Sequence, residues 1–337
     1  MEPTTIDMVS LRAGVSKTTV SRYLNGKYEH MSEKTKQKIK TVIKELNYRP
    51  NIIARSLKSK KTGLIGVIVS DVTNPVVVNL VKGVIDYCTK EGYQVVTASS
   101  DEESNKEREY VLSMMDRQVE GIIVNIVDYN DYEMLKTMTE RGANIVLADR
   151  TICENHLDMV TTDNYAMTRY AVKTLYEKGF EAVGLFSSEM LKSNVRLARY
   201  NGFMDESNNR LPNPKEFVFL LNKTEEYKPA LLNFLQKTKG KRAAVFAATP
   251  MALLNLVGAL RELNLSFPDD LGICGYDNLP WTNLVDGGLT VVEQPFYEVR
   301  AKSAEILIDR IRNNIPEEKK YVELKSKLIL RNSTNIV

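Results

Sequence analysis

Residues 14–26 read GVSKTTVSRYLNG, a stretch bounded by glycines that carries four serine and threonine side chains and two cations. A helix over 17–25, which turns about 100° per residue, would divide these residues into a polar and an apolar face. We expect Ser16 to cap the start of this helix and Gly26 to end it in a left-handed conformation. The polar face consists of Lys17, Thr18, Ser21, Arg22 and Asn25, opposite Val20, Tyr23 and Leu24.

A shorter helix is predicted just before this stretch. Ile6, Val9 and Ala13 are spaced to form one apolar side, with Thr4 or Thr5 at its start. Two short helices joined by a turn that contains glycine form a helix-turn-helix pattern. A third helix follows over 32–46, with a serine cap, an apolar inner face and five lysines along its length.

The charge of the chain is distributed unevenly. Residues 1–61 contain 14 Lys and Arg against 5 Asp and Glu, whereas the rest of the chain contains 32 against 38. A basic head on a mildly acidic body indicates contact with a polyanion, although a solvated basic face is the alternative on charge alone. Arginine and asparagine pair with base edges, and hydroxyl groups contact phosphates, so we predict that the head binds DNA. The predicted contacts in the head are Thr5, Ser16, Lys17, Thr18, Thr19, Ser21, Arg22 and Asn25.

The segment 47–61 reads NYRPNIIARSLKSKK and follows the third helix. Pro50 ends that helix, and the next basic helix is too short to be stable alone in water. An exposed Leu57 on such a helix matches the apolar wedge of minor-groove binders. A linker whose Leu57 packs on the next domain fits the residues equally well. The predicted DNA contacts of this segment are Asn51, Ala54, Leu57 and Lys58.

From residue 62 onward, short apolar strands alternate with helices in two runs, the second of which restarts after VTTDN (160–164). This alternation is typical of parallel sheets with helices on both faces, so we predict two doubly wound α/β lobes. Ligands of such folds lie beyond the carboxyl ends of the strands. The expected strands lie at 64–69, 94–99, 121–124, 144–148, 183–186, 217–220, 243–247 and 272–276, with one edge strand near 321–330.

The loops and helices after those strands supply candidate contacts to a small ligand. A carboxylate that accepts ligand hydroxyls beside an indole suits a sugar, and several arginines favour an anionic ligand. The candidates are Asp149, Arg150, Arg196, Arg199, Asp277 and Trp281. The structural alternatives are a buried ion pair for Asp149 and Arg150, a solvated helix face for Arg196 and Arg199, and core packing for Trp281.

Motifs of catalysis and metal binding are missing from the sequence. There is no GxGxxG after a strand, no GxxxxGK[ST], no HExxH and no GxSxG. The two histidines, His30 and His156, lack metal spacing, and the three cysteines form no CxxC. No apolar run is long enough to cross a bilayer, and no secretory signal is visible. We therefore expect a cytoplasmic protein that has no catalytic residues, cofactor, metal or membrane partner.

Several further stretches stand out along the chain: TIDMVSLRAGVSKTTVSRYLNG (5–26), SEKTKQKIKTVIKELNYRPN (32–51), ARSL (54–57), IGVIVSDVTNP (65–75), GYDN (275–278) and LTVVEQP (289–295). Together they resemble the lactose-repressor-type (LacI/GalR) family of transcription regulators. The similarity runs in order along essentially the whole chain and implies a dimeric bacterial regulator that is not an enzyme.

The resemblance implies a helix-turn-helix head over 1–48, a hinge helix within 49–61 and a body like periplasmic sugar-binding proteins. One lobe would comprise 62–161 and 291–320, and the other 162–290 and 321–330. It also implies that Lys17, Thr18 and Arg22 read the major groove of each half of a palindromic operator, and that Leu57 is a minor-groove wedge. Asp149, Arg199, Asp277 and Trp281 would line an effector cleft between the lobes, with Arg196 one turn before Arg199.

Two departures from the family pattern bear on the effector. Val76 and Val77 follow NP where aromatics are frequent, and Thr249-Pro250 stands where many members have Asn-Asp, which loses a carboxylate. Fewer acids and more arginines favour an acidic effector. SRYLNGKY (21–28), LADR (147–150) and VTTDN look most like regulators of 2-keto-3-deoxygluconate and hexuronate breakdown.

We expect a repressor that works as a homodimer and is controlled by a sugar-acid effector, either as an inducer or as a corepressor. A sugar-binding transport receptor and a sugar-acid enzyme are the competing hypotheses for the body alone.

Overall fold

The computed structural model describes residues 4–48, 61–73, 75–152, 156–190, 192–313 and 318–335. The chain divides into two compact units, Met1–Thr62 and Gly63–Val337, which are considered separately below.

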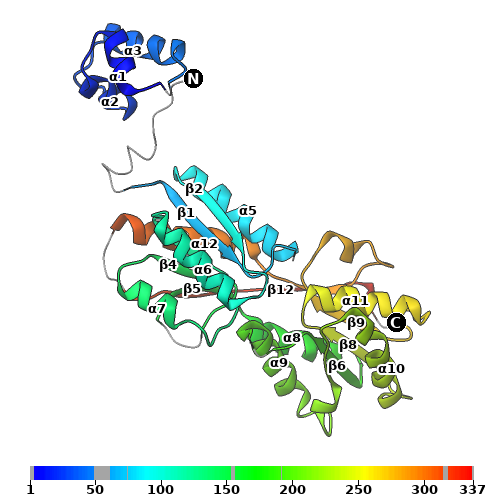
Figure 1. The fold of residues 1–337 in the computed structure, drawn as a ribbon. Helices are drawn as coiled ribbons and strands as arrows, with labels where there is room; N and C mark the ends of the chain where they lie inside the picture. Colours follow the sequence, from blue (N-terminus) through cyan, green and yellow to red (C-terminus); the bar gives the residue numbers. More distant parts are fainter. Residues whose placement is uncertain are drawn as a thin grey trace. The chain divides into compact units, whose positions relative to one another are not determined.

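The first unit is a head of three helices, α1 (Ile6–Ala13), α2 (Lys17–Leu24) and α3 (Glu33–Glu45) (Figure 1). Each begins at a hydroxyl cap that accepts a backbone N–H: Thr5 from Met8, Ser16 from Thr19 and Ser32 from Thr35. Gly14 ends α1 with a φ of 59° and Gly26 follows α2 with a φ of 71°, values that glycine adopts without strain. The core of the head consists of Val9, Ala13, Val20, Ile39 and Val42. The predicted boundaries and caps of these helices are therefore confirmed.

The second unit contains two six-stranded sheets, and we call each sheet with its helices a lobe. In the first lobe the strand order is β11-β5-β4-β3-β1-β2, and all of the strands are parallel. Its strands are β1 (Leu64–Val69), β2 (Gln94–Ser99), β3 (Gly121–Val124), β4 (Ile145–Ala148), β5 (Asp158–Thr162) and β11 (Tyr321–Leu324). Its helices are α5 (Pro75–Lys90), α6 (Ser104–Asp116), α7 (Glu133–Glu140) and α12 (Phe296–Asn313).

The second lobe repeats this arrangement with the order β12-β10-β9-β8-β6-β7, in which β12 alone among the described strands runs antiparallel. Its strands are β6 (Ala182–Ser187), β7 (Val218–Leu220), β8 (Ala243–Ala247), β9 (Gly272–Tyr276), β10 (Thr290–Glu293) and β12 (Lys327–Ile329). Its helices are α8 (Asn164–Glu177), α9 (Asn194–Ser207), α10 (Tyr227–Lys237) and α11 (Pro250–Glu262). Short 3-10 turns are η1 (Pro214–Phe217), η2 (Thr224–Glu226), η3 (Pro280–Asn283) and η4 (Asn332–Thr334).

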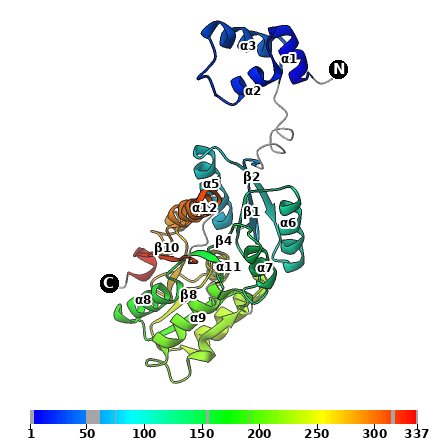
Figure 2. The ribbon, with the colours of Figure 1, turned by 90° about the vertical axis from the view of Figure 1, so that its left-hand side faces the viewer.

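Both sheets are covered on both faces, as the continuous apolar strands predict. In the first lobe, alternate residues of β1 point to opposite sides: Ile65 and Val67 pack under α5 and α12, whereas Ile68 packs under α6 and α7. In the second lobe, α10 and α11 cover one face and α8 and α9 the other. Figures 1 and 2 show α5 and α12 side by side on the first sheet.

The chain crosses between the lobes later than the sequence analysis placed its second and third crossings. β10 pairs with β9, so residues up to 293 belong to the second lobe, and α12 then returns to the first. β11 pairs with β5 in the first lobe, and only β12 belongs to the second. The single edge strand expected near 321–330 is two strands in two sheets, with a break at 325–326. Short apolar strands have the same local sequence pattern in either sheet, so the pattern does not show which strands pair.

Candidate functional site

The exposed face of α2 is the candidate nucleic-acid surface. Lys17, Thr18 and Arg22 are exposed, while Val20 on the opposite side is fully buried in the head core. The helix is eight residues long and carries two cations and no acid. This leaves a compact polar face of the size that fits the major groove.

Three predicted DNA contacts also have structural roles in the head. Thr5 and Ser16 cap α1 and α2, and the Ser16 hydroxyl lies 2.9 Å from that of Thr19. Asn25 donates its amide to the carbonyl of Ser21 at 2.8 Å, so it closes the last turn of α2. The Lys17 ammonium pairs with the exposed carboxylate of Asp7 on α1. A phosphate group that binds Lys17 would replace this carboxylate. The predicted contacts Asn51, Ala54, Leu57 and Lys58 lie outside the described residues.

Polar side chains gather at the carboxyl ends of neighbouring strands in the first lobe. Ser70 after β1 donates to Asn125 after β3 at 2.7 Å, and Asn125 donates to the Asp149 carboxylate after β4 at 3.1 Å. Asp149 has a φ of 70°, an unusual conformation that turns the chain sharply at the strand end. This hydrogen-bonded row holds the Asp149 carboxylate at the edge of the sheet where parallel-sheet ligands bind.

Glu102 connects this edge to the second lobe. Both oxygens of its carboxylate bond the Arg150 guanidinium, one of them at 2.9 Å, and the Arg196 guanidinium of α9 lies 3.8 Å away. Burial alone would raise the pKa of Glu102, but the hydrogen bonds and charge of Arg150, with the charge of Arg196, lower it below its ordinary value. Burial and the charge of Arg150 lower the pKa of Arg196. Arg196 also donates to the carbonyl of Glu189 at 2.9 Å.

The second lobe contributes Arg199 and Asp277. Arg199 is buried, donates to the Asn164 side-chain oxygen at 2.8 Å and to the Ala248 carbonyl at 2.7 Å, and lies on the Tyr276 ring. Asp277 accepts from the Gln294 amide at 2.7 Å, and Gln294 in turn accepts from Thr162 at the first crossing between the lobes. Burial raises the pKa of Asp277 to about 6, although the charge of Arg199 and the bond from Gln294 oppose this.

The structure thus brings five of the six predicted ligand residues toward the junction of the two lobes. We call Glu102, Asp149, Arg150, Arg196, Arg199 and Asp277 the inter-lobe cluster. The same junction is tied by the backbone N–H of Thr151, which donates to Asn194 of α9 at 3.2 Å. Trp281, in η3, is partly buried against the apolar core beneath α10 and α11. Its role in ligand binding stays a prediction.

Several members of this network were not predicted from the sequence. Gln294 lies in LTVVEQP (289–295), where no strand was predicted, so its position was not marked by such a signal. Glu102 lies in the loop SSDEE (99–103) after the strand predicted at 94–99, so position after a strand was a usable signal for it. Asn125 follows GIIV in the same way. The partners of these residues are distant in the sequence, however. Asp149 is 24 residues from Asn125 and Arg150 is 48 residues from Glu102, separations that no local pattern reveals.

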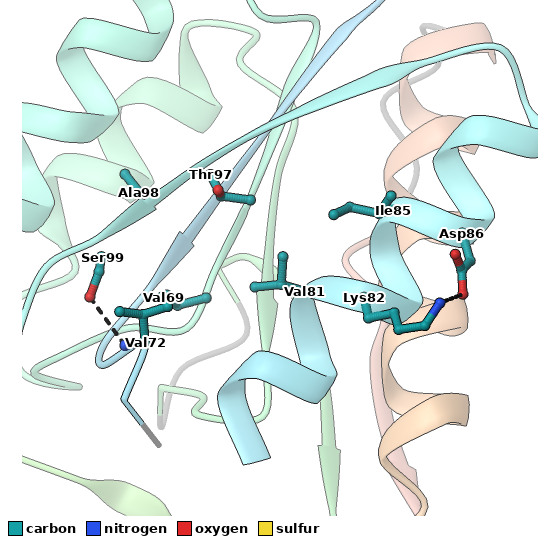
Figure 3. Close-up of a pocket in the computed structure, with 9 residues that line it drawn as sticks. All are labelled: Val69, Val72, Val81, Lys82, Ile85, Asp86, Thr97, Ala98 and Ser99. Carbon is teal, nitrogen blue, oxygen red and sulfur yellow. Dashed lines mark hydrogen bonds and ion pairs between the residues drawn. The ribbon is translucent and has the colours of Figure 1, made fainter. Parts of the chain in front are cut away.

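A separate pocket of about 360 Å³ lies between α5 and the edge strand β2 (Figure 3). Its walls are mostly apolar, and its two charged residues, Lys82 and Asp86, pair with each other at 2.8 Å. Such a pocket offers no unpaired charge to a sugar acid, and it is not part of the inter-lobe cluster. Its lining consists of Val69, Val72, Val81, Lys82, Ile85, Asp86, Thr97, Ala98 and Ser99.

Among the residues that the structure describes, no His, Cys, Asp and Glu side chains gather in a metal-binding group. In the same part of the chain, no helix has both the length and the apolar character needed to cross a bilayer.

A helix-turn-helix head joined to a two-lobed α/β body with polar groups at the lobe junction defines a DNA-binding regulator of the ligand-responsive class. Known proteins agree with this class. Residues 5–51 match the model of bacterial regulatory proteins of the lacI family, and 172–334 match a periplasmic binding protein-like domain. The HTH-type transcriptional regulator KdgR of Bacillus subtilis is 34% identical over 334 residues, which cover 98% of this chain and 97% of that protein. The chain belongs to the lacI family of transcription regulators, and it is not an enzyme.

Two further similarities support the assignment. The regulator PtxS of Pseudomonas putida is 32% identical to this chain, and the matched region covers 99% of this chain and 96% of PtxS. The crystal structure of the lac repressor dimer bound to operator and the anti-inducer ONPF superposes with a TM-score of 0.87 over 99% of both chains. At 22% identity, that structure shows a shared fold.

Proposed function

We propose that this regulator is a cytoplasmic repressor that binds a palindromic operator as a homodimer. Its operator affinity is set by an acidic sugar, of the 2-keto-3-deoxygluconate type, that binds at the inter-lobe cluster. The observation that carries the ligand class is the concentration of Arg150, Arg196 and Arg199 at strand ends and on α9, beside Asp149 and Asp277.

The exposed face of α2 supports the DNA-binding part of the proposal. Arg22 is exposed and presents the fork of donors that recognises guanine, while Lys17 and Thr18 sit one turn earlier for phosphate or base contacts. A palindromic site follows from two such heads in a symmetric dimer.

The sugar part rests on the chemistry of the cluster and on similarity. Asp149 and Asp277 are acceptors that suit ligand hydroxyls, and the arginines suit a carboxylate. The similarity to KdgR over nearly the whole chain favours the ligand class inferred from SRYLNGKY, LADR and VTTDN.

The dimer is supported by two unpartnered apolar surfaces. β2 is the edge strand of the first sheet, where Val96 is 39% exposed, and Ile85 of the neighbouring helix α5 is 38% exposed. The pocket of Figure 3 opens between these two elements. In the second lobe, Met251 and Leu254 of α11 are exposed in the same way. An unpaired strand edge and apolar patches of this kind suit coverage by a second copy of the chain.

The test combines operator selection with a ligand panel. Random duplex DNA selected by the full-length protein should converge on a palindrome, and a mobility-shift titration with that site should respond to sugar acids, including 2-keto-3-deoxygluconate. Trp281, the single tryptophan, provides a parallel fluorescence titration. Matched neutral sugars are the control. Convergence on no site would remove the DNA-binding proposal, and a response to neutral sugars alone would remove the acidic effector.

A further inference from the structure

Three arginine side chains in the described part of the chain are buried: Arg150, Arg199 and Arg300. Arg150 donates hydrogen bonds to the Glu102 carboxylate. Arg199 donates to the side-chain oxygen of Asn164 and to the backbone carbonyl of Ala248. Arg300 differs from both. It is 7% exposed, and its buried Nε has no hydrogen-bond partner. No ion pair observed within the described residues includes this guanidinium, so it is a buried cation without a bonded anion.

The position of Arg300 places this cation near the lobe junction. It lies one turn into α12, whose first residue Phe296 directly follows the crossing segment that carries Gln294. Side chains on a helix lean toward its N-terminus, and the Arg300 guanidinium accordingly lies 5.6 Å from the Phe296 ring centroid. Gln294 itself bonds Asp277 of the inter-lobe cluster. The guanidinium is therefore directed back toward the end of the first lobe that faces the cluster.

The surroundings are shaped to hold an arginine at this position. The aliphatic stem of Arg300 packs on Gly83 of α5, where an added Cβ would approach the Arg300 Cδ to 2.5 Å. A glycine is thus needed opposite the stem, and the close packing of α5 on α12 fixes the direction of the side chain.

The electrostatics agree with this geometry. Burial lowers the pKa of Arg300 to about 10, and the charges of Glu298 and Asp149 offset this only in part. The group is still a cation at neutral pH. A buried cation without a bonded partner is unfavourable, and an anionic ligand that bonds it would remove this penalty.

We propose that Arg300 recognises the acidic group of the effector, so that the ligand's carboxylate faces the first lobe at α12 and its hydroxyls face Asp277 in the second. This inference rests on the proposed function and specifies the residue that selects sugar acids over neutral sugars. Arg150 and Arg199 already donate hydrogen bonds within the protein, so Arg300 adds to the cluster a cation that has no bonded partner.

The experiment compares the full-length protein with Arg300→Met, which keeps the length and apolar stem but removes the charge. Titration calorimetry with 2-keto-3-deoxygluconate and gluconate, and with glucose as the neutral probe, measures the affinities. We expect Arg300→Met to bind the acids about 10- to 100-fold more weakly, as for the loss of a charge-assisted hydrogen bond, with operator binding in the absence of ligand unchanged. Arg312→Met, on the same helix but exposed, is the matched control.

Two further variants test the role of Arg300 without relying on Arg300→Met alone. Gly83→Ala keeps the charge but crowds the Arg300 stem, so it should weaken binding of the acids while leaving the charge of the chain unchanged. Arg300→Lys should retain part of the affinity, because a lysine offers the charge without the bidentate fork.

The outcomes separate the two levels of inference. If the unmodified protein binds the acids and Arg300→Met binds them equally well, the role of Arg300 is overturned and the acidic effector stands. If the unmodified protein binds none of the acids, the proposed ligand class fails and the role of Arg300 fails with it.

Discussion

The substitution Asp277→Asn should make the ligand-free protein more stable at neutral pH. Asp277 follows β9 with a φ of 76°, a conformation that asparagine tolerates well, and the residue is 3% exposed. Burial raises its pKa from 3.8 to about 6, against the opposing effects of Arg199 and Gln294. Asparagine keeps the oxygen that accepts from Gln294 and removes the buried charge.

The magnitude follows from the two pKa values. The folded protein binds the Asp277 proton more tightly than the unfolded chain does. The stability that protonated Asp277 contributes is therefore fully present below pH 3.8 and is lost as the pH rises through about 6. At pH 8 the ionised group therefore costs about 3 kcal/mol, and at pH 5 about 1.6 kcal/mol. For a body of this size, the melting temperature of the variant should exceed that of the parent by roughly 6–12 °C at pH 8.

Thermal unfolding of both proteins between pH 5 and pH 8, without ligand, measures this difference. The exposed Asp269→Asn is the control, because it removes a charge of the same sign from a solvated loop. A stability gain that is the same at pH 5 and pH 8, or no gain at either pH, would refute the reasoning. The variant should also bind the effector more weakly, since the charge that is unfavourable in the free protein is the proposed acceptor of ligand hydroxyls.

Three further results are expected. Arg22→Ala should weaken operator binding about 10- to 100-fold and relax discrimination at one base pair in each half-site, as measured by mobility shifts on operator variants; unchanged discrimination would exclude Arg22 from base readout. Gly202→Ala should lower the free energy of unfolding by about 1–3 kcal/mol in urea denaturation, because the new Cβ would lie 2.5 Å from the Tyr165 carbonyl oxygen; a neutral effect would mean that α8 and α9 separate easily. Val96→Glu should shift the protein toward monomers in sedimentation velocity, and a dimer as stable as the parent would place the interface away from β2.

Local signals carried most of the fold prediction. The caps Ser16 and Ser32 and the glycines around α2 are short-range features, so the helices of the head could be placed to within a residue or two. The alternation of strands and helices likewise gave the two doubly wound sheets. The strand β10 was not predicted, and the lobe bounds that the resemblance implied placed 291–293 in the first lobe and 321–324 in the second. The structure instead pairs β10 with β9 and β11 with β5, a choice that short apolar segments do not reveal by themselves.

The candidate site was also predictable only in part, from local signals. Position after a strand identified Asp149 and Asp277, because the carboxyl ends of parallel strands meet at one edge. It did not show that Arg150 is already bonded by Glu102, since that pair is separated by 48 residues. Arg300 was not singled out because, in the sequence of α12, it is one more charged residue on a helix, and its burial depends on Gly83 of another helix.

The place of β11 in the first sheet also bears on how the protein is made on the ribosome. The head is complete once residue 48 has emerged, so its three helices can fold while most of the chain is unsynthesised. The first lobe has to wait for residues 321–324 before its last strand can pair with β5, and β12 at 327–329 completes the second lobe only a few residues later. Both lobes therefore reach their full sheets almost together, once residues 321–329 have been made. A nascent chain carries a folded DNA-binding head well before it has a body that can respond to a ligand.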